Sequence, residues 1–177
     1  MCRKFFLVGF LVVALSAQSQ KYVLTEGVIT FFSEATLENI RAKNTKVSSV
    51  FNITTSEIAF SVPINQFQFE KKLMQQHFNE KYMESEKFPR STFSGRLEGF
   101  QLSLVGVQRV RVVGKLSIHG VTQSVEIPGT VEVKSDNLSM HSVFKIKLID
   151  YKIKIPQLLW QNIAEEVEVT VSFTYKP

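Results

Sequence analysis

The residues that could carry acid–base, nucleophilic or metal chemistry are few and far apart in this 177-residue chain. There are three histidines, His77, His119 and His141, and one cysteine, Cys2. No histidine lies at metal-ligand spacing from another or from a cluster of carboxylates, and a single thiol forms neither a disulfide within the chain nor a cysteine-based zinc site. No nucleophile elbow, phosphate-binding loop or paired-histidine zinc motif occurs. We therefore predict that the protein is not an enzyme and that it uses no metal or cofactor.

Aromatic side chains are the more informative group. Six of the fifteen phenylalanines lie between Phe67 and Phe100, together with Met74, Tyr82 and Met83. Two interpretations fit this concentration. The side chains pack a helix onto a sheet, or they line a cavity for an apolar ligand, a role that suits large phenylalanine and adaptable methionine side chains.

Two of the histidines also allow two interpretations each. His77 ends an apolar row on a predicted helix, where it either contacts the head group of a ligand or stands at the helix edge in water. His119 precedes Gly120 in a predicted turn, where it either forms a hydrogen bond within that turn or contacts a ligand.

The elements that position these residues are mostly strands. Apolar and polar residues alternate with period two in several segments, as expected where one face of an antiparallel sheet is buried and the other is in water. Turn residues at His119–Gly120 and Ser135–Asn137 connect successive segments. Pro128–Gly129 falls inside a strand pattern and indicates a bulge or a sheet edge. The clearest alternating segments are Ile29–Phe31, Glu57–Val62, Thr92–Glu98, Val110–Ile118, Phe144–Leu148 and Glu166–Tyr175.

We count about eight strands, which predicts an all-β antiparallel fold, either an up-and-down barrel or a sandwich. One segment departs from period two. From Phe69 to Tyr82 the apolar residues follow helical spacing, so we expect an amphipathic helix that lies on an apolar surface. Pro156–Ala164 indicates a short second helix.

The first nineteen residues have the order of a secretory signal. Arg3 and Lys4 precede an eleven-residue apolar run, Phe5–Leu15, and small and polar residues follow at 16–19. The run is too short to cross a bilayer, which takes about 20 residues. Cys2 lies before the run, so it is not placed to anchor a lipoprotein.

We therefore expect a cleaved Sec-type signal at 1–19, one domain at 20–177, and a periplasmic or secreted protein without stable membrane insertion. Removing nineteen residues leaves 158, and the net charge falls from +5 to +3 because Arg3 and Lys4 are lost. The remaining basic residues form no stripe interleaved with stacking aromatics, so we expect no nucleic-acid partner. We leave open whether the barrel forms a homodimer.

Four runs of the sequence resemble the YceI-like family of exported lipid-binding proteins. The pattern G-x-L-[ST]-x-H-G-V-T within Gly114–Thr122, after an F-P-x-x-x-F segment, is the most specific part. The first strand departs from the D-x-x-H-S start of many members, because Leu24–Phe31 contains no histidine. The runs that carry the resemblance are Phe67–Phe78, Lys87–Gly95, Gly114–Thr122 and Asp150–Pro156.

The resemblance implies a lipocalin-like barrel closed by helical pieces that binds a polyisoprenoid or another long-chain amphiphile without catalysis. Two alternatives are a structural or interaction barrel with a filled core, and a lipid-modifying enzyme with His77 beside a carboxylate. Our candidate ligand-binding residues, for the lining or mouth of the barrel, are Phe67, Phe69, Leu73, Met74, His77, Phe78, Tyr82, Met83, Phe88 and Phe93.

Overall fold

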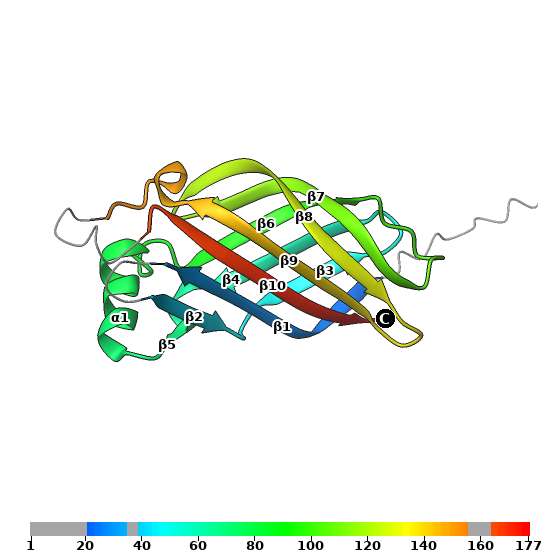
Figure 1. The fold of residues 1–177 in the computed structure, drawn as a ribbon, viewed down its shortest axis with the longest axis horizontal. Helices are drawn as coiled ribbons and strands as arrows, with labels where there is room; N and C mark the ends of the chain where they lie inside the picture. Colours follow the sequence, from blue (N-terminus) through cyan, green and yellow to red (C-terminus); the bar gives the residue numbers. More distant parts are fainter. Residues whose placement is uncertain (1–20, 35–38, 156–163) are drawn as a thin grey trace, which may run out of the picture.

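The computed structural model describes residues 21–34, 39–155 and 164–177. These residues form one antiparallel sheet that closes on itself, with a helical segment across one end (Figure 1). The strands are β1 (Lys21–Ser33), β2 (Ile40–Asn44), β3 (Ser48–Asn52), β4 (Glu57–Pro63), β5 (Gln68–Phe69), β6 (Arg90–Glu98), β7 (Gly106–Ile118), β8 (Val121–Val133), β9 (Leu138–Lys147) and β10 (Glu166–Lys176).

Two positions of the barrel wall are each occupied by a pair of short strands. The first half of β1 pairs with β3 and its second half with β2, from Lys21–Asn52 to Ser33–Ile40. In the same way β4 pairs with β3 and β5 pairs with β2. The pairs β2–β3 and β4–β5 therefore act as two interrupted strands, and the ring has eight positions.

Neighbouring positions in the ring are also neighbours in the sequence, and β10 returns to pair with β1 over nine residue pairs, from Val23–Lys176 to Phe32–Glu168. This closure removes the exposed edges that an open sheet would leave. The prediction of an eight-stranded antiparallel fold is confirmed, and the closed ring decides for a barrel over a sandwich.

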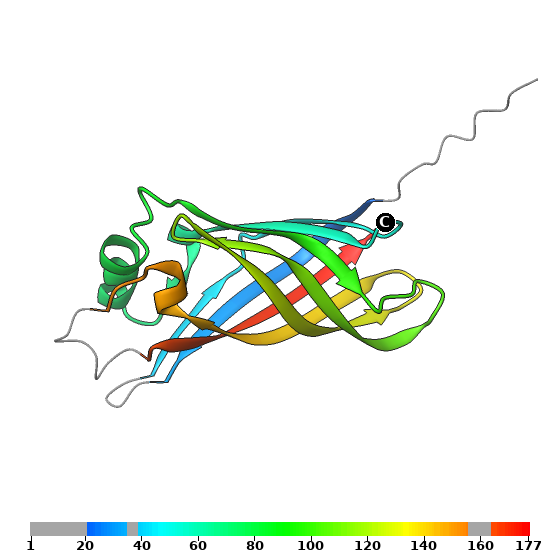
Figure 2. The ribbon, with the colours of Figure 1, turned by 90° about the horizontal axis from the view of Figure 1, so that it is seen from above.

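The predicted amphipathic helix is present but begins later than expected. α1 (Lys72–His77) continues into a wider π-helical turn, η2 (Phe78–Tyr82), which ends with the Met83 amide donating to the Phe78 carbonyl oxygen at 2.8 Å. Phe69 belongs to β5, where it pairs with Ala42, because the ladder to β2 extends to this residue. Figures 1 and 2 both place α1 at the end of the barrel opposite the C-terminus.

Two short 3-10 turns complete the described helical structure, η1 (Ile64–Gln66) between β4 and β5 and η3 (Leu148–Tyr151) after β9. The second helix expected at Pro156–Ala164 lies almost entirely outside the described residues. The signal expected at 1–19 also lies outside them. Within the described ranges, no helix has the length and apolar character needed to cross a membrane.

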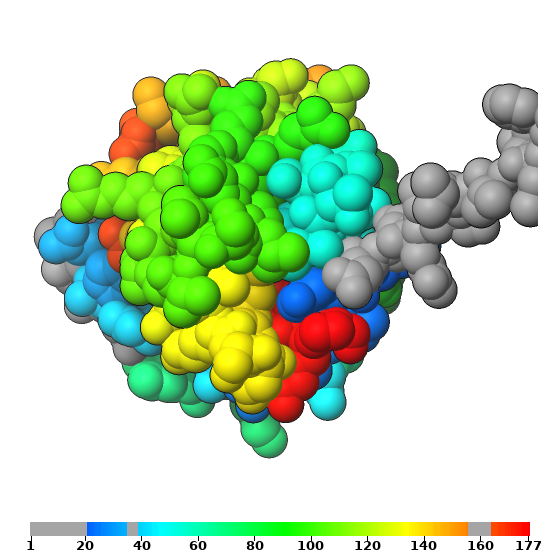
Figure 3. Space-filling model, turned by 90° about the vertical axis from the view of Figure 1, so that its right-hand side faces the viewer, coloured from blue at the N-terminus to red at the C-terminus, as the bar shows by residue number. Residues whose placement is uncertain are grey.

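The half of the barrel away from α1 is tightly packed. Phe51 and Tyr175 are fully buried there, with ring centroids 6.0 Å apart, and Phe173 is only 2% exposed. Figure 3 views this end along the barrel and shows side chains of the β6–β7 loop, the turn after β3, the β8–β9 turn and the C-terminus meeting across it. The fully buried aromatic side chains are thus concentrated in one half of the barrel.

Candidate functional site

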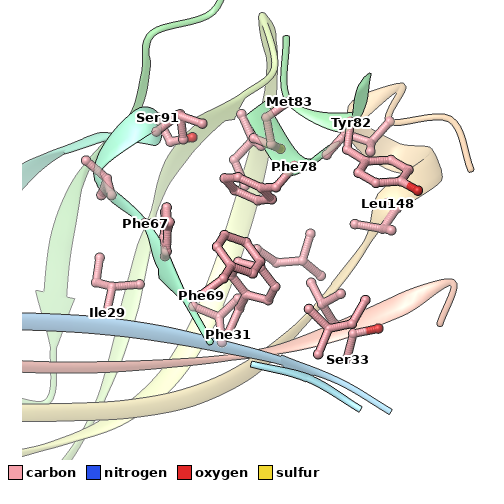
Figure 4. Close-up of a pocket in the computed structure, with 18 of the residues that line it drawn as sticks. Ile29, Phe31, Ser33, Phe67, Phe69, Phe78, Tyr82, Met83, Ser91 and Leu148 are labelled. Carbon is pink, nitrogen blue, oxygen red and sulfur yellow. The ribbon is translucent and has the colours of Figure 1, made fainter. Parts of the chain in front are cut away.

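A cavity of about 540 Å³ occupies the half of the barrel next to α1 (Figure 4). Strands β1, β2, β4, β6, β7, β9 and β10 contribute to its wall, and β5, α1 and η2 line it at the end. The volume lies within the range of about 300–1,000 Å³ that is typical of small-molecule sites. Its lining is almost entirely aliphatic and aromatic, so it is suited to an apolar guest.

The structure brings together most of the residues that the sequence singled out. Phe88 and Phe93 do not line this cavity. Phe93 is 3% exposed and stacks on Phe60 in the packed core, with 5.1 Å between ring centroids. The candidates that line the cavity are Phe67, Phe69, Leu73, Met74, His77, Phe78, Tyr82 and Met83.

Phe78 is the centre of an aromatic cluster that holds the helical segment against the barrel. Its ring centroid lies 5.4 Å from that of Phe31, 5.5 Å from that of Phe67 and 5.0 Å from that of Phe69. Each such ring pair contributes about 0.5–1.5 kcal/mol beyond the burial of its area. The cluster therefore fixes η2 over the end of β1 and β5, as Figure 4 shows.

The candidates missed by sequence reasoning lie on the strands. Phe31 on β1, Phe144 and Ile146 on β9, and Val169 and Val171 on β10 all line the cavity. The signal for them was present, because each belongs to the apolar side of an alternating segment. Alternation identifies the inner face of a barrel, but it does not tell which inner residues touch one another and which face a void.

Four polar side chains line the cavity, those of Ser33, His77, Tyr82 and Ser91. Ser33 is buried, and its Oγ accepts a hydrogen bond from the Ala164 amide at 3.0 Å. Partial burial raises the pKa of the Tyr82 phenol above its ordinary value, and the hydroxyl can donate a hydrogen bond into the cavity. Among the described lining residues there is no aspartate, glutamate, lysine or arginine.

His119 does not bond within its own turn and does not line the cavity. Its Nε2 lies 2.9 Å from Glu84 Oε2, just after the helical segment, and its Nδ1 lies 3.2 Å from the carbonyl oxygen of Tyr151 in η3. Phe88 packs against the imidazole, with 4.6 Å between ring centroids, and a Cβ at Gly120 would lie 2.5 Å from the Phe88 ring. The His119–Gly120 hairpin therefore connects Glu84, just after the helical segment, with Tyr151 in η3. We call these contacts of His119, together with its contact with Phe88, the hairpin tie.

In the described part of the chain, no three histidine, cysteine, aspartate or glutamate side chains gather as a metal site would require. His77 and His119 serve the cavity wall and the hairpin tie. His141 lies on the outside of β9, where its Nδ1 is 3.2 Å from Ser172 Oγ. The arrangement therefore offers an apolar cavity with a few polar side chains in its wall.

These features define a class of protein, the small lipocalin-like barrel with an apolar interior cavity. The particular family follows from comparison with known proteins. The model of the YceI-like domain matches residues 22–175, and the chain belongs to this family. The resemblance noted in the sequence is thereby confirmed, and no curated protein matches the chain significantly.

Solved structures share the fold at low sequence identity. A polyisoprenoid binding domain from Saccharophagus degradans implicated in plant cell wall breakdown has a TM-score of 0.75 at 17% identity, covering 88% of this chain and 97% of its own. BcnA of Burkholderia cenocepacia has a TM-score of 0.71 at 16% identity, covering 84% and 95%. The YCEI protein of Campylobacter jejuni has a TM-score of 0.61 at 13% identity, covering 99% of both chains.

Proposed function

We propose that this protein is an exported, non-catalytic binding protein for a long-chain amphiphile, a polyisoprenoid or a fatty-acid-like lipid. The observation that carries the proposal is the cavity of about 540 Å³, lined mostly by apolar side chains from the barrel strands and the helical segment. The naming of the Saccharophagus degradans relative as a polyisoprenoid binding domain supports the same class of ligand.

Burial of the apolar chain supplies the binding free energy. Each methylene removed from water contributes about 0.8 kcal/mol, so about ten give roughly 8 kcal/mol before the costs of association and ordering. Useful affinity then needs little polar recognition, which agrees with a described lining that has four polar side chains and no aspartate, glutamate, lysine or arginine. His77 and Tyr82 are the groups we expect nearest the polar end of the ligand.

The two alternative functions fit the described residues less well. A structural barrel requires a filled interior, and this interior contains a cavity. A lipid-modifying enzyme built on His77 requires a carboxylate beside it as a positioning or proton-accepting group, and the described lining has none. Among the three candidate functions, the apolar cavity therefore favours ligand binding.

Export rests on the sequence of residues 1–19, and we propose that this segment is removed and that the barrel works in the periplasm or outside the cell. Expression of the whole chain with its own N-terminus tests this directly. We expect the mass of the exported protein to correspond to cleavage after Ser19 or Ala17. Protein that keeps its full length inside the cell would contradict the proposal.

Native mass spectrometry of the purified barrel tests the binding function. We expect co-purified lipid, or uptake of farnesol or palmitic acid as added probes. The variant Met74→Trp places an indole in the cavity from α1, and we expect it to bind the probes at least tenfold more weakly. Gln76→Trp is the matched control, because Gln76 lies on the exposed side of the same helix and bonds Glu80 at 3.0 Å. Protein that is always empty and takes up neither probe would refute the function.

A further inference from the structure

A second, smaller cavity of about 60 Å³ lies deeper in the barrel, toward the packed half. It shares Phe60, Phe144 and Val171 with the large cavity, so these three side chains separate the two spaces. Beyond them its wall is formed by core residues such as Leu97 and Val110. The interior of the barrel is therefore divided by side chains and not by backbone.

The two aromatic members of this partition are held differently. Phe60 on β4 stacks on Phe93, with 5.1 Å between ring centroids, and lies edge-on to Phe173 at 5.6 Å. Phe144 on β9 is only half-buried, although its place in the alternating pattern directs it inward. Because the partition consists of apolar side chains, a rotamer change at Phe144 could open it without breaking a backbone hydrogen bond.

The small cavity meets the barrel wall where two strands stop pairing. The described ladder between β8 and β9 comprises four pairs, from Val133–Leu138 to Thr130–His141. By contrast, β7 and β8 pair along their whole length, and β9 and β10 pair as far as Lys147–Glu166. Figure 1 shows the β8 and β9 ribbons bowing apart beyond this point.

Local chemistry explains why the ladder ends there. Pro128 has no amide hydrogen to donate, and the Ser142 hydroxyl instead donates to its carbonyl oxygen at 2.7 Å. A Cβ at Gly129 would lie 2.9 Å from the His141 carbonyl oxygen, so β8 and β9 are still close at this residue. Gly129, Thr130 and Ser142 line the small cavity together with the outward-facing His141, so the cavity reaches the outer face of the barrel at this seam. Of the two alternatives that the sequence allowed at Pro128–Gly129, the sheet edge is therefore correct, and this edge faces β9. There is no bulge, because the register between β8 and β7 continues here without a shift.

We propose that Phe60 and Phe144 set the length of the chain that the protein accepts. A short chain fills the large cavity and ends against these rings. A longer chain displaces Phe144, enters the small cavity and extends toward the seam between β8 and β9, where the wall can widen without loss of ladder hydrogen bonds. This inference rests on the proposed function and assigns the chain-length preference to a side-chain partition.

Calorimetric titration with unbranched fatty alcohols of increasing length tests the proposal. For the wild type we expect affinity to rise by about fourfold per added methylene and then to level off where the chain reaches the partition. Phe144→Ala should shift this limit to longer chains by merging the two cavities. Phe60→Leu, which keeps an apolar side chain in the core, should shift it in the same direction.

Two further variants make the result specific. Ile146→Ala is the matched control, since Ile146 lies on the same side of β9 as Phe144 and lines the large cavity but not the small one. It should weaken binding of every alcohol without moving the limit. Met140→Phe fills the small cavity and, combined with Phe144→Ala, should return the limit to the wild-type length.

The possible failures are distinguishable. A wild type that binds no alcohol of any length would overturn the proposed function itself. If the wild type binds the alcohols, and Phe144→Ala and Phe60→Leu show the same chain-length limit as the wild type, the role of the partition is contradicted. The binding function is then unaffected. A limit that moves equally in Ile146→Ala would also contradict the role of the partition, because the change would then reflect total cavity volume.

Discussion

At the scale of single residues, the buried hydroxyls of Ser49 and Tyr175 show how the packed half tolerates polar groups. The two oxygens are 2.7 Å apart, and Ser49 Oγ is 2.9 Å from the Ala59 carbonyl oxygen. Because a serine has one hydroxyl hydrogen and a carbonyl only accepts, Ser49 donates to Ala59 and Tyr175 donates to Ser49. Burial raises the pKa of Tyr175 well above its ordinary value.

This shift predicts a loss of stability in alkali. In the unfolded chain Tyr175 ionises near pH 10, whereas in the folded barrel it stays protonated to higher pH. The free energy of unfolding should therefore be insensitive to this group below about pH 10 and fall above it, by up to about 1.4 kcal/mol per pH unit. Urea denaturation from pH 8 to pH 11.5 measures the slope.

Tyr175→Phe is the comparison for this prediction. At pH 8 it should lose about 1 kcal/mol, the usual worth of one hydrogen bond. Above pH 10 its stability should fall less steeply than that of the wild type. Parallel curves for the two proteins across the alkaline range would show that the burial of this phenol is not linked to folding.

At the scale of elements, the long alternating strands and their turns follow from the sequence, and the short ones do not. β2 and β3 were not predicted from the sequence because each has a polar residue at an inward position, Asn44 in β2 and Ser49 in β3. Asn44 is fully buried, its amide nitrogen donates to the Pro63 carbonyl oxygen at 2.8 Å, and its oxygen accepts from the Lys46 amide at 2.8 Å. These bonds compensate the burial, so the strand forms where a hydrophobic pattern predicts none.

The candidate site residues were also only partly predictable from the sequence. Helical periodicity identified Met74, Phe78 and Tyr82 because one face of a helix covers the cavity directly. Phe88 and Phe93 belong to the same aromatic segment, but neither lines the large cavity, and Phe93 lines the small one. Phe88 joins the hairpin tie at His119, which no local pattern indicates, and Phe93 covers two glycines on the paired strands β6 and β7.

Those glycines give the prediction at this scale. Gly95 and Gly114 are directly opposite each other in the β6–β7 ladder. A Cβ at Gly114 would lie 2.4 Å from the Ser94 carbonyl oxygen and 2.7 Å from the Phe93 ring. Since the closest atom belongs to the backbone, the strands must shift, and Gly114→Ala should destabilise the barrel by about 1–3 kcal/mol.

Gly27→Ala on β1 is the matched control, because the added Cβ would meet only the flexible end of the Leu24 side chain. We expect its stability to change by less than about 1 kcal/mol. Urea unfolding of both variants measures the difference. Equal stabilities would contradict the close approach of β6 and β7 at this pair.

At the scale of the whole molecule, the barrel combines a packed half with a half that encloses a void. The fully buried aromatic residues lie away from α1, whereas Phe31, Phe69, Phe78, Phe144 and Ile146 are only partly buried around the cavity. Cavity-lining atoms lack partners on one side and lose the dispersion contacts that a filled core would give. The helical end therefore draws its stability from the Phe78 cluster and the His119 tie, and a bound chain would complete its packing.

This asymmetry predicts that ligand binding stabilises the molecule and does so mainly at the cavity end. A ligand at a hundred times its dissociation constant adds about 2.7 kcal/mol to the free energy of unfolding. For a domain of this size that corresponds to a rise in Tm of about 5–10 °C. Differential scanning calorimetry with and without farnesol measures it, and amide hydrogen exchange should show the added protection in α1, η2 and the β9 residues near Ile146. Met74→Trp occupies part of the same space, and a tenfold loss of affinity reduces the gain at the same farnesol concentration to about 1.4 kcal/mol. Its Tm should therefore rise at most about half as much as that of the wild type, whereas Gln76→Trp should respond as the wild type does. A farnesol-induced rise of equal size in Met74→Trp would place the binding outside the cavity.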